Sequence, residues 1–404
     1  MALAQGIKKQ TIVGTQTGLG TPKTGAGGQI LRRRTSTFTA NRDMFENDEI
    51  VSHQQSTGVT YGLKKVEGKI EGLLSCQTYE DLIAAGMRKE FTATSAFSAG
   101  TDVTATVAAP QFVDASAGYL AAGLKVGDVG RWTGFATTGV GNNARNFLIT
   151  ALTAGNMSGV FLDGLPAAAK AAGDAVTFTV VGKKSLVPLT GHTDIFFTFE
   201  EWYSDLARSE RFDDCKVSSI NVSLPATGNA SIDFDIIGLS RTLGAAQSFT
   251  TPTAETVTAV MSALNGSVFV QGTEVTNITG AQITIDGGVK PVSAVLGSNV
   301  SPDMDRGRIK VSGSFTALFD SATLQTLYDA ETPISLIIVA TVDPSATSDF
   351  MTFTMGRIKL TGDAPDDGEK SILRTYPFTA ELNSAGGAAL AWDQTIITIQ
   401  DSQA

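Results

Sequence analysis

The sequence predicts a mostly β protein in which a β-sandwich or barrel domain with a flanking short helix is duplicated, with a small β domain inserted. Three observations lead to this prediction: the composition, a repeated strand–helix stretch, and a charge-poor segment between the two parts of the first domain. The chain has 404 residues, enough for two or three domains. Its 42 glycines and its apolar content of 42% are typical of a folded, turn-rich β protein.

The repeated stretch covers residues 65–85 and residues 310–330, which align without a gap at an offset of 245. Seven of the 21 aligned positions are identical, namely Lys65/Lys310, Val66/Val311, Gly68/Gly313, Leu73/Leu318, Thr78/Thr323, Leu82/Leu327 and Ala85/Ala330. Each copy begins with period-2 alternation, which predicts a strand with one buried face. Each then changes to helical spacing at Ser75 and Asp320, residue types that favour a helix N-terminus. Because solenoid units span only ~20–50 residues, we expect two copies of a whole domain; the alternative is a chance likeness of two amphipathic units.

The first part of the chain predicts an arm, a strand and a loop. Residues 1–29 are rich in Gly, Thr and Lys but lack the spacing of a phosphate-binding loop, so we expect a flexible N-terminal arm. Residues 29–39 predict a strand, and residues 40–61 predict a long polar loop. Four apolar residues of this loop have no periodic partner, so we expect them to contact another subunit. They are Met44, Phe45, Ile50 and Val51.

Residues 91–189 predict a small inserted β domain. They are rich in Ala, Gly, Thr and Val, and they contain five strand-like runs separated by turn signals. Such short, evenly spaced strands are typical of a small barrel or sandwich. The first large domain would then comprise residues 30–90 and 190–243, and it would end in a hairpin over residues 215–238.

The remaining chain predicts the second copy of the large domain, over residues 265–404. A Thr- and Ala-rich connector, residues 243–265, precedes it. Further strands are expected at residues 334–342, 351–360 and 375–382. A last strand within residues 391–400 follows a Gly- and Ala-rich hinge, and we expect it to pair outside its own domain.

The charge balance argues against several classes of partner. The chain carries 30 Lys and Arg against 40 Asp and Glu, a net charge of −10, and no basic cluster long enough to follow a phosphate backbone. No apolar run approaches the ~18 residues of a membrane span, and the N-terminus lacks the apolar core of a signal peptide. We therefore expect folding in a cytoplasm, no membrane contact, and free, buried thiols at Cys76 and Cys215.

The sequence lacks the patterns that catalytic and metal sites require. No second His or Cys completes a metal-ligand set near His53 or His192. Nucleophile-elbow, CxxC and dinucleotide-binding patterns are missing. Asp303 and Asp305 lack the further ligands of a calcium loop. We expect no catalytic residue, no metal and no cofactor, and we infer a chain that is built for assembly.

Several stretches together resemble a known family. They are GTQTGLGTPKTGAGGQILRR, ENDEIVSHQQ and VEGKIEGLLSCQTYEDLIAAGMRKEF in the first 91 residues, and ERFDDCKVSSINVSLPATGNASIDFDIIG at residues 210–238. They look like the major tail tube proteins of long, non-contractile-tailed bacteriophages (siphophages), in the type with two tube domains per chain. The segment GLKVGDVGRWTGF…NNARNFLITALTAGNMSGV resembles a small β domain that is inserted in many of them.

The resemblance implies a structural virion protein that is not an enzyme. Inner strands of neighbouring subunits would join into a β-barrel, and rings would stack into a hollow tail tube that delivers the genome. Three copies would form a pseudo-hexameric ring, assembled in the host cytoplasm. The implied partners are further copies of the chain, a tape-measure protein, the tail terminator and distal tail proteins, and genomic DNA that crosses the lumen without specific binding.

The resemblance also suggests positions in the tube. The loop residues Met44, Phe45, Ile50 and Val51 become candidates for contacts between rings. Alternating polar residues of the repeated strands become candidates for the lumen wall. These are Glu67, Lys69, Glu71, Arg308, Lys310, Ser312 and Ser314.

Two other functions remain as alternatives. The first is an Ig-like phage decoration or fibre protein, which would be stable as a monomer and would need no long inter-ring loop. The second is a carbohydrate-binding or hydrolytic module, which requires clustered aromatics and a carboxylate pair across a cleft. Trp132, Trp202 and Trp392 are scattered along the sequence, which disfavours the second alternative.

Overall fold

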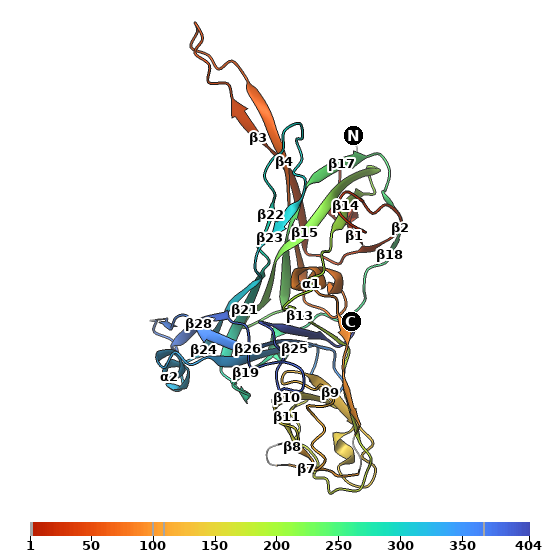
Figure 1. Cartoon of the computed structure of the whole chain (residues 1–404), viewed down its shortest axis with the longest axis vertical. Coiled ribbons are helices and arrows are strands. Elements are labelled where there is room, and N and C mark those ends of the chain that lie inside the picture. The colour runs from red at the N-terminus through yellow and green to blue at the C-terminus, as the bar shows by residue number, and fades with distance from the viewer. Residues whose placement is uncertain (1–2, 99–100, 108–109, 367) are drawn as a thin grey trace.

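The structure, a computed structural model, describes residues 3–98, 101–107, 110–366 and 368–404. Figure 1 shows a projecting hairpin at one end of the long axis, a body of sheets in the middle and a smaller β region at the other end. The described residues form a network of 20 strands and two separate sheets of seven and two strands. The prediction of a mostly β fold is confirmed.

A central sheet joins the two large parts of the chain. Its seven strands are each antiparallel to the next. In spatial order they are β3 (Thr35–Glu46), β4 (Val59–Leu73), β16 (Ser231–Gly238), β15 (Arg208–Leu224), β21 (Ile278–Asp286), β24 (Lys310–Leu318) and β28 (Leu373–Ala380). β15 pairs with β21 from Ser219 opposite Asp286 to Leu224 opposite Ala281. One hydrophobic core therefore runs through both parts without a break.

Flanking strands complete each part of the body. We call β1–β5 and β13–β18 the first half; its flanking strands are β1 (Lys9–Thr15), β2 (Gly25–Ile30), β5 (Thr92–Ala93), β13 (Lys183–Leu186), β14 (Phe197–Tyr203), β17 (Ser240–Gly244) and β18 (Phe249–Thr253). We call β19–β29 the second half; its flanking strands are β19 (Ser267–Val270), β20 (Thr273–Glu274), β25 (Ile334–Thr341), β26 (Phe350–Leu360), β27 (Ala364–Pro365) and β29 (Thr398–Asp401). β29 pairs with both β13 and β26, so the last strand bridges the two halves.

The first hairpin of each half has the same register. Thr35 lies opposite Glu71 in the β3–β4 pair, and Gly280 lies opposite Thr316 in the β21–β24 pair. Both partners are displaced by 245 residues, from 35 to 280 and from 71 to 316. The 245-residue offset of the sequence repeat therefore also relates β3 to β21, two strands in which the repeat was not visible.

The second hairpin of each half matches as well. Lys216 lies opposite Ile237 in the β15–β16 pair, and Lys359 lies opposite Thr379 in the β26–β28 pair, displaced by 143 and 142 residues. Both hairpins then shift their register by one residue, and β27 continues the second one. The displacement is smaller than 245 because the first half carries extra residues between its helix and β14.

The repeated glycines have a steric reason. Gly68 lies beside the ring of Phe38 on the adjacent strand, and a Cβ there would come within 2.4 Å of that ring. Gly313, at the same place in the second copy, lies beside Phe378, where a Cβ would come within 2.6 Å of the ring. Each glycine thus allows an aromatic side chain to cross the strand next to it.

A short helix follows the repeated strand in each half, as predicted. The helices are α1 (Glu80–Met87) and α2 (Thr323–Asp329). The predicted starts at Ser75 and Asp320 are wrong by several residues. The Ser75 hydroxyl lies 2.7 Å from the hydroxyl of Thr78 within a turn, so its side chain is used before the helix begins.

The two helices differ in burial. α1 packs on β15 so closely that a Cβ on Gly86 would lie 2.4 Å from Cδ1 of Ile220. Its buried residues are Leu82, Ile83, Ala84, Gly86 and Met87. By contrast, α2 has no buried residue among those described.

Most of the segment that was predicted to be a flexible arm is strand. β1 pairs with β14 along its whole length and also with β2, so the arm prediction for residues 1–29 is wrong over both strands. The ring of Phe249 packs against Gly14 and Gly28, where a Cβ would come within 2.6 Å of it. The glycines therefore serve close packing of a ring. Residues 3–8, which precede β1, are all exposed and include a 3-10 turn, η1 (Gly6–Lys8).

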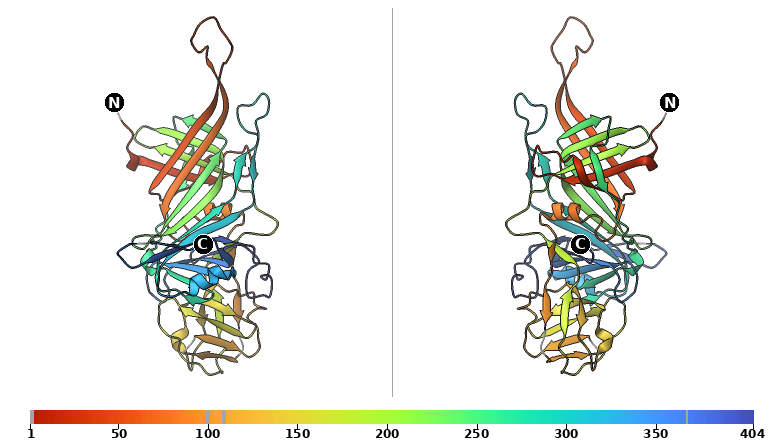
Figure 2. Two further views of the ribbon diagram at one scale, coloured as in Figure 1. Left: turned by 90° about the vertical axis from the view of Figure 1, so that its left-hand side faces the viewer. Right: turned by 90° about the vertical axis from the view of Figure 1, so that its right-hand side faces the viewer.

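The predicted inserted segment contains a separate seven-stranded sheet, which we call the insertion. Its strands are β6 (Ala96–Ser98), β7 (Val103–Thr106), β8 (Gln111–Asp114), β9 (Val129–Thr133), β10 (Asn146–Leu152), β11 (Asn156–Phe161) and β12 (Thr177–Val180), with a 3-10 turn, η2 (Val140–Asn142). Figure 2 shows it at the end of the molecule opposite the projecting hairpin. Trp132, Phe112 and Phe147 pack at its centre.

The insertion docks on the second half, although the sequence places it within the first. Its core continues into Phe269 and Ile337. The Gln400 side chain of β29 accepts from the Val129 N–H at 2.9 Å and donates to the Val129 carbonyl at 2.8 Å. Lys184 of β13 bonds Asp128 of the insertion at 2.8 Å. Three parts of the chain are thereby fastened together.

Candidate assembly surface

The two faces of the central sheet differ in chemistry because side chains alternate along each strand. One face packs into the core, with buried residues such as Ile70, Phe234, Ile220, Ile283 and Phe315. The opposite face carries Ser, Thr, Asn, Gln and charged side chains, and we call it the polar face. The prediction of one buried face for the repeated strands is confirmed.

The polar face continues across the β15–β21 pair. Residues opposite one another on successive strands form rows that run through both halves. One row consists of Thr37, Lys69, Asp235, Ser219, Asp286 and Lys310. The next consists of Thr35, Glu71, Asp233, Asn221, Thr284, Ser312 and Thr379.

Six of the seven predicted lumen residues lie on this polar face. Glu67, Lys69 and Glu71 alternate along β4, and Lys310, Ser312 and Ser314 alternate along β24. None of the six is buried. Arg308 is exposed but precedes β24, so it lies outside the strand.

The first half of the polar face is locally acidic. Four carboxylates on β4 and β16 flank Lys69, which bonds Glu71 at 2.9 Å and lies 3.6 Å from Asp233. The hydrogen bond between Lys69 and Glu71 raises the pKa of the ammonium group and lowers the pKa of the carboxylate. Partial burial raises the pKa of Asp233. The lysine offsets only part of the negative charge.

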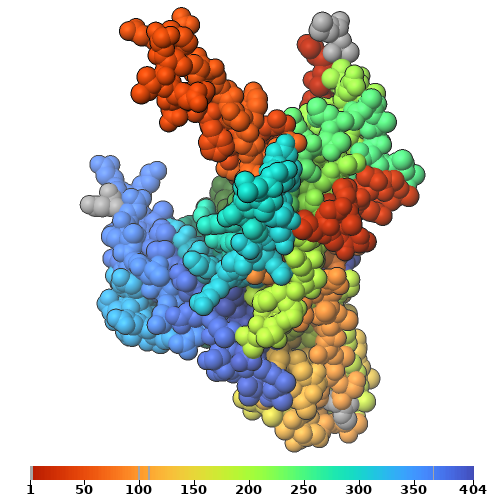
Figure 3. All heavy atoms as spheres, turned by 45° about the horizontal axis from the view of Figure 1, so that its top comes forward, coloured from red at the N-terminus to blue at the C-terminus, as the bar shows by residue number. Residues whose placement is uncertain are grey.

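The projecting hairpin corrects the predicted loop at residues 40–61. β3 and β4 pair out to Glu46 opposite Val59, so only residues 47–58 form the loop. Figures 1 and 3 show this hairpin standing clear of the body. From here on, the arm means this β3–β4 hairpin and not the N-terminal segment. The predicted contact residues lie on the arm and are exposed: Met44 and Phe45 by 62%, Ile50 by 102% and Val51 by 37%.

A second, shorter hairpin lies next to the arm. It is formed by β22 (Val289–Pro291) and β23 (Met304–Arg306) and belongs to the second half. The Lys64 N–H of the arm donates to the Asn299 carbonyl of this hairpin at 2.9 Å. The base of the arm is thus held by the second half, whereas the hydrogen bonds of residues 47–58 to other described residues all lie within the hairpin.

The β15–β21 pair is locked by a residue that the sequence did not indicate. Arg88 follows α1 in a left-handed conformation with φ 58°, and only 8% of it is exposed. Its guanidinium donates to the Gly307 carbonyl at 2.9 Å and to the Gly287 carbonyl at 2.5 Å. Both carbonyls belong to the second half, at the base of the β22–β23 hairpin. The only sequence signal was a charged residue at the end of an amphipathic helix.

Among the described strands that pair on one side only, β3 and β27 are the counterparts of the strands that form the β15–β21 pair. β3 pairs with β4 on one side only, whereas its counterpart β21 pairs with both β24 and β15. β27 likewise pairs only with β28, whereas its counterpart at the end of β15 has two neighbours. Unpaired edges expose backbone N–H and C=O groups that can bind another strand.

The reactive side chains are dispersed. Cys76 and Cys215 are free and buried, and burial raises the pKa of both thiols. His53 lies in the exposed loop of the arm, whereas desolvation lowers the pKa of His192 in the body. No group of three or more metal-ligating side chains occurs among residues 3–98, 101–107, 110–366 and 368–404.

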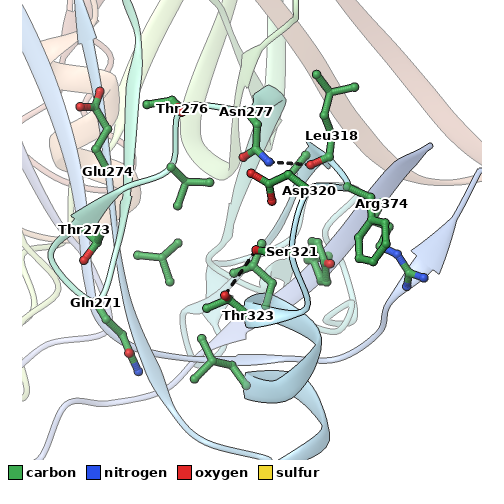
Figure 4. Close-up of a pocket in the computed structure, with 17 residues that line it drawn as sticks. Gln271, Thr273, Glu274, Thr276, Asn277, Leu318, Asp320, Ser321, Thr323 and Arg374 are labelled. Carbon is green, nitrogen blue, oxygen red and sulfur yellow. Dashed lines mark hydrogen bonds between the residues drawn. The ribbon is translucent and has the colours of Figure 1, made fainter. Parts of the chain in front are cut away.

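A pocket of about 370 Å³ lies between α2 and the β19–β20 turn. Figure 4 shows its polar walls, in which the Asn277 amide donates to the Leu318 carbonyl at 2.6 Å. The charged residues of its lining are Glu274, Asp320 and Arg374. In the described part of the chain, no helix has the length and apolar character needed to cross a membrane.

Comparison with known proteins gives a family match. A search of the curated proteins finds no match. A family model described as phage tail tube protein matches residues 3–380, which is nearly the whole chain. The chain therefore belongs to the phage tail tube protein family.

Proposed function

We propose that copies of this chain join edge to edge into rings and that the rings stack into the hollow tube of a long, non-contractile phage tail. The observation that carries this proposal is the β15–β21 pair. It is a joint between two similar halves, and the free edges at β3 and β27 are the counterparts of the strands that form it. A second copy can therefore repeat the same joint.

The register of the repeated joint follows from the displacements between the halves. Ser219 lies opposite Asp286 in the joint within the chain. The counterpart of Ser219 in the second half is Gly362, 143 residues later, and the counterpart of Asp286 in the first half is Asn41, 245 residues earlier. Gly362 of one copy would therefore lie opposite Asn41 of the next. Head-to-tail joints of this kind close a ring when the rotation fits. Two tube-like domains in each chain make three copies the equivalent of a six-fold ring.

The polar face suits the inner wall of such a ring. Its small hydroxyl side chains and carboxylates offer no array of cations to hold phosphates, so DNA could slide past it. The tape-measure protein would occupy the same channel before the genome does. The tail terminator and distal tail proteins would meet the two ends of the stack.

Electron microscopy of the purified chain at high concentration tests the ring directly. We expect hollow rings with three strong and three weak lobes, stacked into tubes. Rings built from six chains would keep the tube but reject the two domains per chain. A chain that remains monomeric under all conditions, including with added tail-tip proteins, would favour a decoration or fibre protein.

Lysines placed on the polar face test whether it lines the lumen. Asn221→Lys with Ser312→Lys leaves the ion pairs intact and adds cations in one row of the face. Tubes of this variant should retain added DNA fragments at low salt and release them at high salt, because the cations bind phosphates. The control is Thr242→Lys with Thr251→Lys on the flanking strands, which should not retain DNA. Intact tubes of both variants with equal DNA retention would show that the polar face is not the lumen wall.

A further inference from the structure

A slot at the edge of the first half is filled by the connector between the halves. In this slot the Met261 N–H donates to the Leu74 carbonyl at 2.9 Å, and the Ala230 N–H donates to the Met261 carbonyl at 3.0 Å. The next residue, Ser262, lies opposite Asn229 in a β-bridge. Met261, Leu74 and Ala230 are completely buried. The connector thus adds a short strand between the end of β4 and the turn before β16.

The same slot exists in the second half but is open. The Phe319 N–H donates to the Ile372 carbonyl at 2.9 Å, as the Leu74 N–H donates to the Ala230 carbonyl at 2.9 Å. No described residue bonds the Phe319 carbonyl or the Ile372 N–H, the groups that correspond to those bound by Met261. Phe319 is 42% exposed and Ile372 is 46% exposed. The open slot therefore displays two apolar side chains and two free backbone groups.

The N-terminal segment of the chain matches the part of the connector that fills the first slot. The 3-10 turn η1 precedes β1, and the 3-10 turn η3 (Ala263–Asn265) precedes β19, displaced by 257 residues. The strands that follow the two turns agree. Val13 lies opposite Phe199 of β14, Val270 lies opposite Leu336 of β25, and Val270 follows Val13 by the same 257 residues. Met261 therefore corresponds to Ala4, which is exposed along with the rest of residues 3–8.

We propose that residues 3–6 of one copy fill the open slot of the neighbouring copy in the ring. The Ala4 N–H donates to the Phe319 carbonyl of the neighbour, and the neighbour's Ile372 N–H donates to the Ala4 carbonyl. This inference rests on the proposed ring, in which the first half of one copy follows the second half of another. The connector reaches the slot of the half before it, and the N-terminal segment does the same across the joint between copies.

The exposed apolar residues are consistent with this occupant. In the single chain, Leu3 is 79% exposed and Ile7 is 90% exposed. Both belong to the exposed segment of residues 3–8. Two side-chain bonds reach its backbone: the Gln5 N–H donates to Asp205 at 2.7 Å, and the Ser204 hydroxyl donates to the Lys8 carbonyl at 3.0 Å. Seating the segment would cover apolar surface on both copies and would add a strand where backbone groups are free.

A proline at residue 4 tests the backbone contact. Ala4→Pro removes the N–H that would bind Phe319, and the exposed segment should still allow the chain to fold. We expect assembly to require about tenfold more protein, since a backbone acceptor loses its partner in each joint. Leu3→Pro is the matched control, because the N–H of the corresponding Val260 is not used in the filled slot. Equal assembly of both variants and the unchanged chain would overturn the proposal.

A crosslink tests the register and separates this proposal from the ring itself. Ser262 and Asn229 correspond to Gln5 and Ser371, so Gln5→Cys with Ser371→Cys places two thiols across a bridge of about 4.5 Å between Cα atoms. Oxidation should join copies into covalent species that end at a closed trimer. The control pairs Gln5→Cys with Ser384→Cys, which should not crosslink. If tubes form but Gln5→Cys with Ser371→Cys does not crosslink, the proposal for the slot is overturned and the proposed tube function stands. Closed trimers without tubes would support the slot and contradict stacking.

Discussion

Removing the tip of the arm is expected to abolish tube formation while leaving a folded, soluble chain. The variant replaces residues 47–58 by Asn-Gly, which closes the β3–β4 hairpin directly after Glu46 with a two-residue turn. The tip carries Ile50, which is completely exposed, so its loss removes no packing within the chain. If the tip docks on the adjacent ring, each ring loses one contact for every copy. Size-exclusion chromatography and electron microscopy measure the outcome.

A full-length arm with Ile50→Ser separates the length of the arm from its apolar character. Burying an isoleucine side chain contributes about 1.5–3 kcal/mol, so this single change should shift the concentration for assembly by about tenfold or more. Near-ultraviolet circular dichroism should show that both variants keep the packing of the body. If the shortened variant formed normal tubes, the tip of the arm would not be needed for the contact between rings.

Replacing Arg88 by methionine is expected to lower the free energy of unfolding by about 3 kcal/mol. The change keeps an apolar stem of similar length but removes the donors to Gly287 and Gly307. Hydrogen bonds to charged groups contribute about 1.5–3 kcal/mol each, and the Gly287 carbonyl would remain buried without that donor. Urea unfolding followed by tryptophan fluorescence measures the loss.

Arginine and methionine at residue 88 have the same energetic cost from the left-handed backbone conformation, so their difference reports on the guanidinium alone. Arg308→Met is the control, because it removes an exposed guanidinium near the same joint. If both variants unfolded at the same urea concentration as the unchanged chain, Arg88 would not hold the two halves together. An early, separate transition in the Arg88 variant alone would show that the halves come apart before they unfold.

The sequence predicted elements that have one buried face and missed those that do not. The repeated strands show alternation because Val66, Ile70, Val311 and Phe315 are buried on one side. The outer part of the arm is strand as well, yet both of its faces are exposed, so its pairing leaves no apolar period to detect. This is why residues 40–46 and 59–61 were predicted to be loop.

Local composition was misleading where its cause was tertiary. The glycines near the N-terminus predicted flexibility, but Gly14 and Gly28 make room for Phe249, which lies far away in the sequence. The polar face followed from alternation, so most of the candidate lumen residues could be placed on one face. The β15–β21 joint, the Arg88 contact and the open slot depend on pairs of residues more than 50 positions apart, for which no local pattern exists.

The covalent link across the β15–β21 joint has a consequence for how a ring would assemble. Bringing free subunits together costs an estimated 4–15 kcal/mol of translational and rotational entropy for each association. A tether turns an association into an intramolecular event with an effective concentration in the millimolar range or above. In a ring of three copies, half of the joints would be formed during folding of each chain. Fewer diffusional encounters would then be needed per ring, and incomplete rings would be rarer at low protein supply.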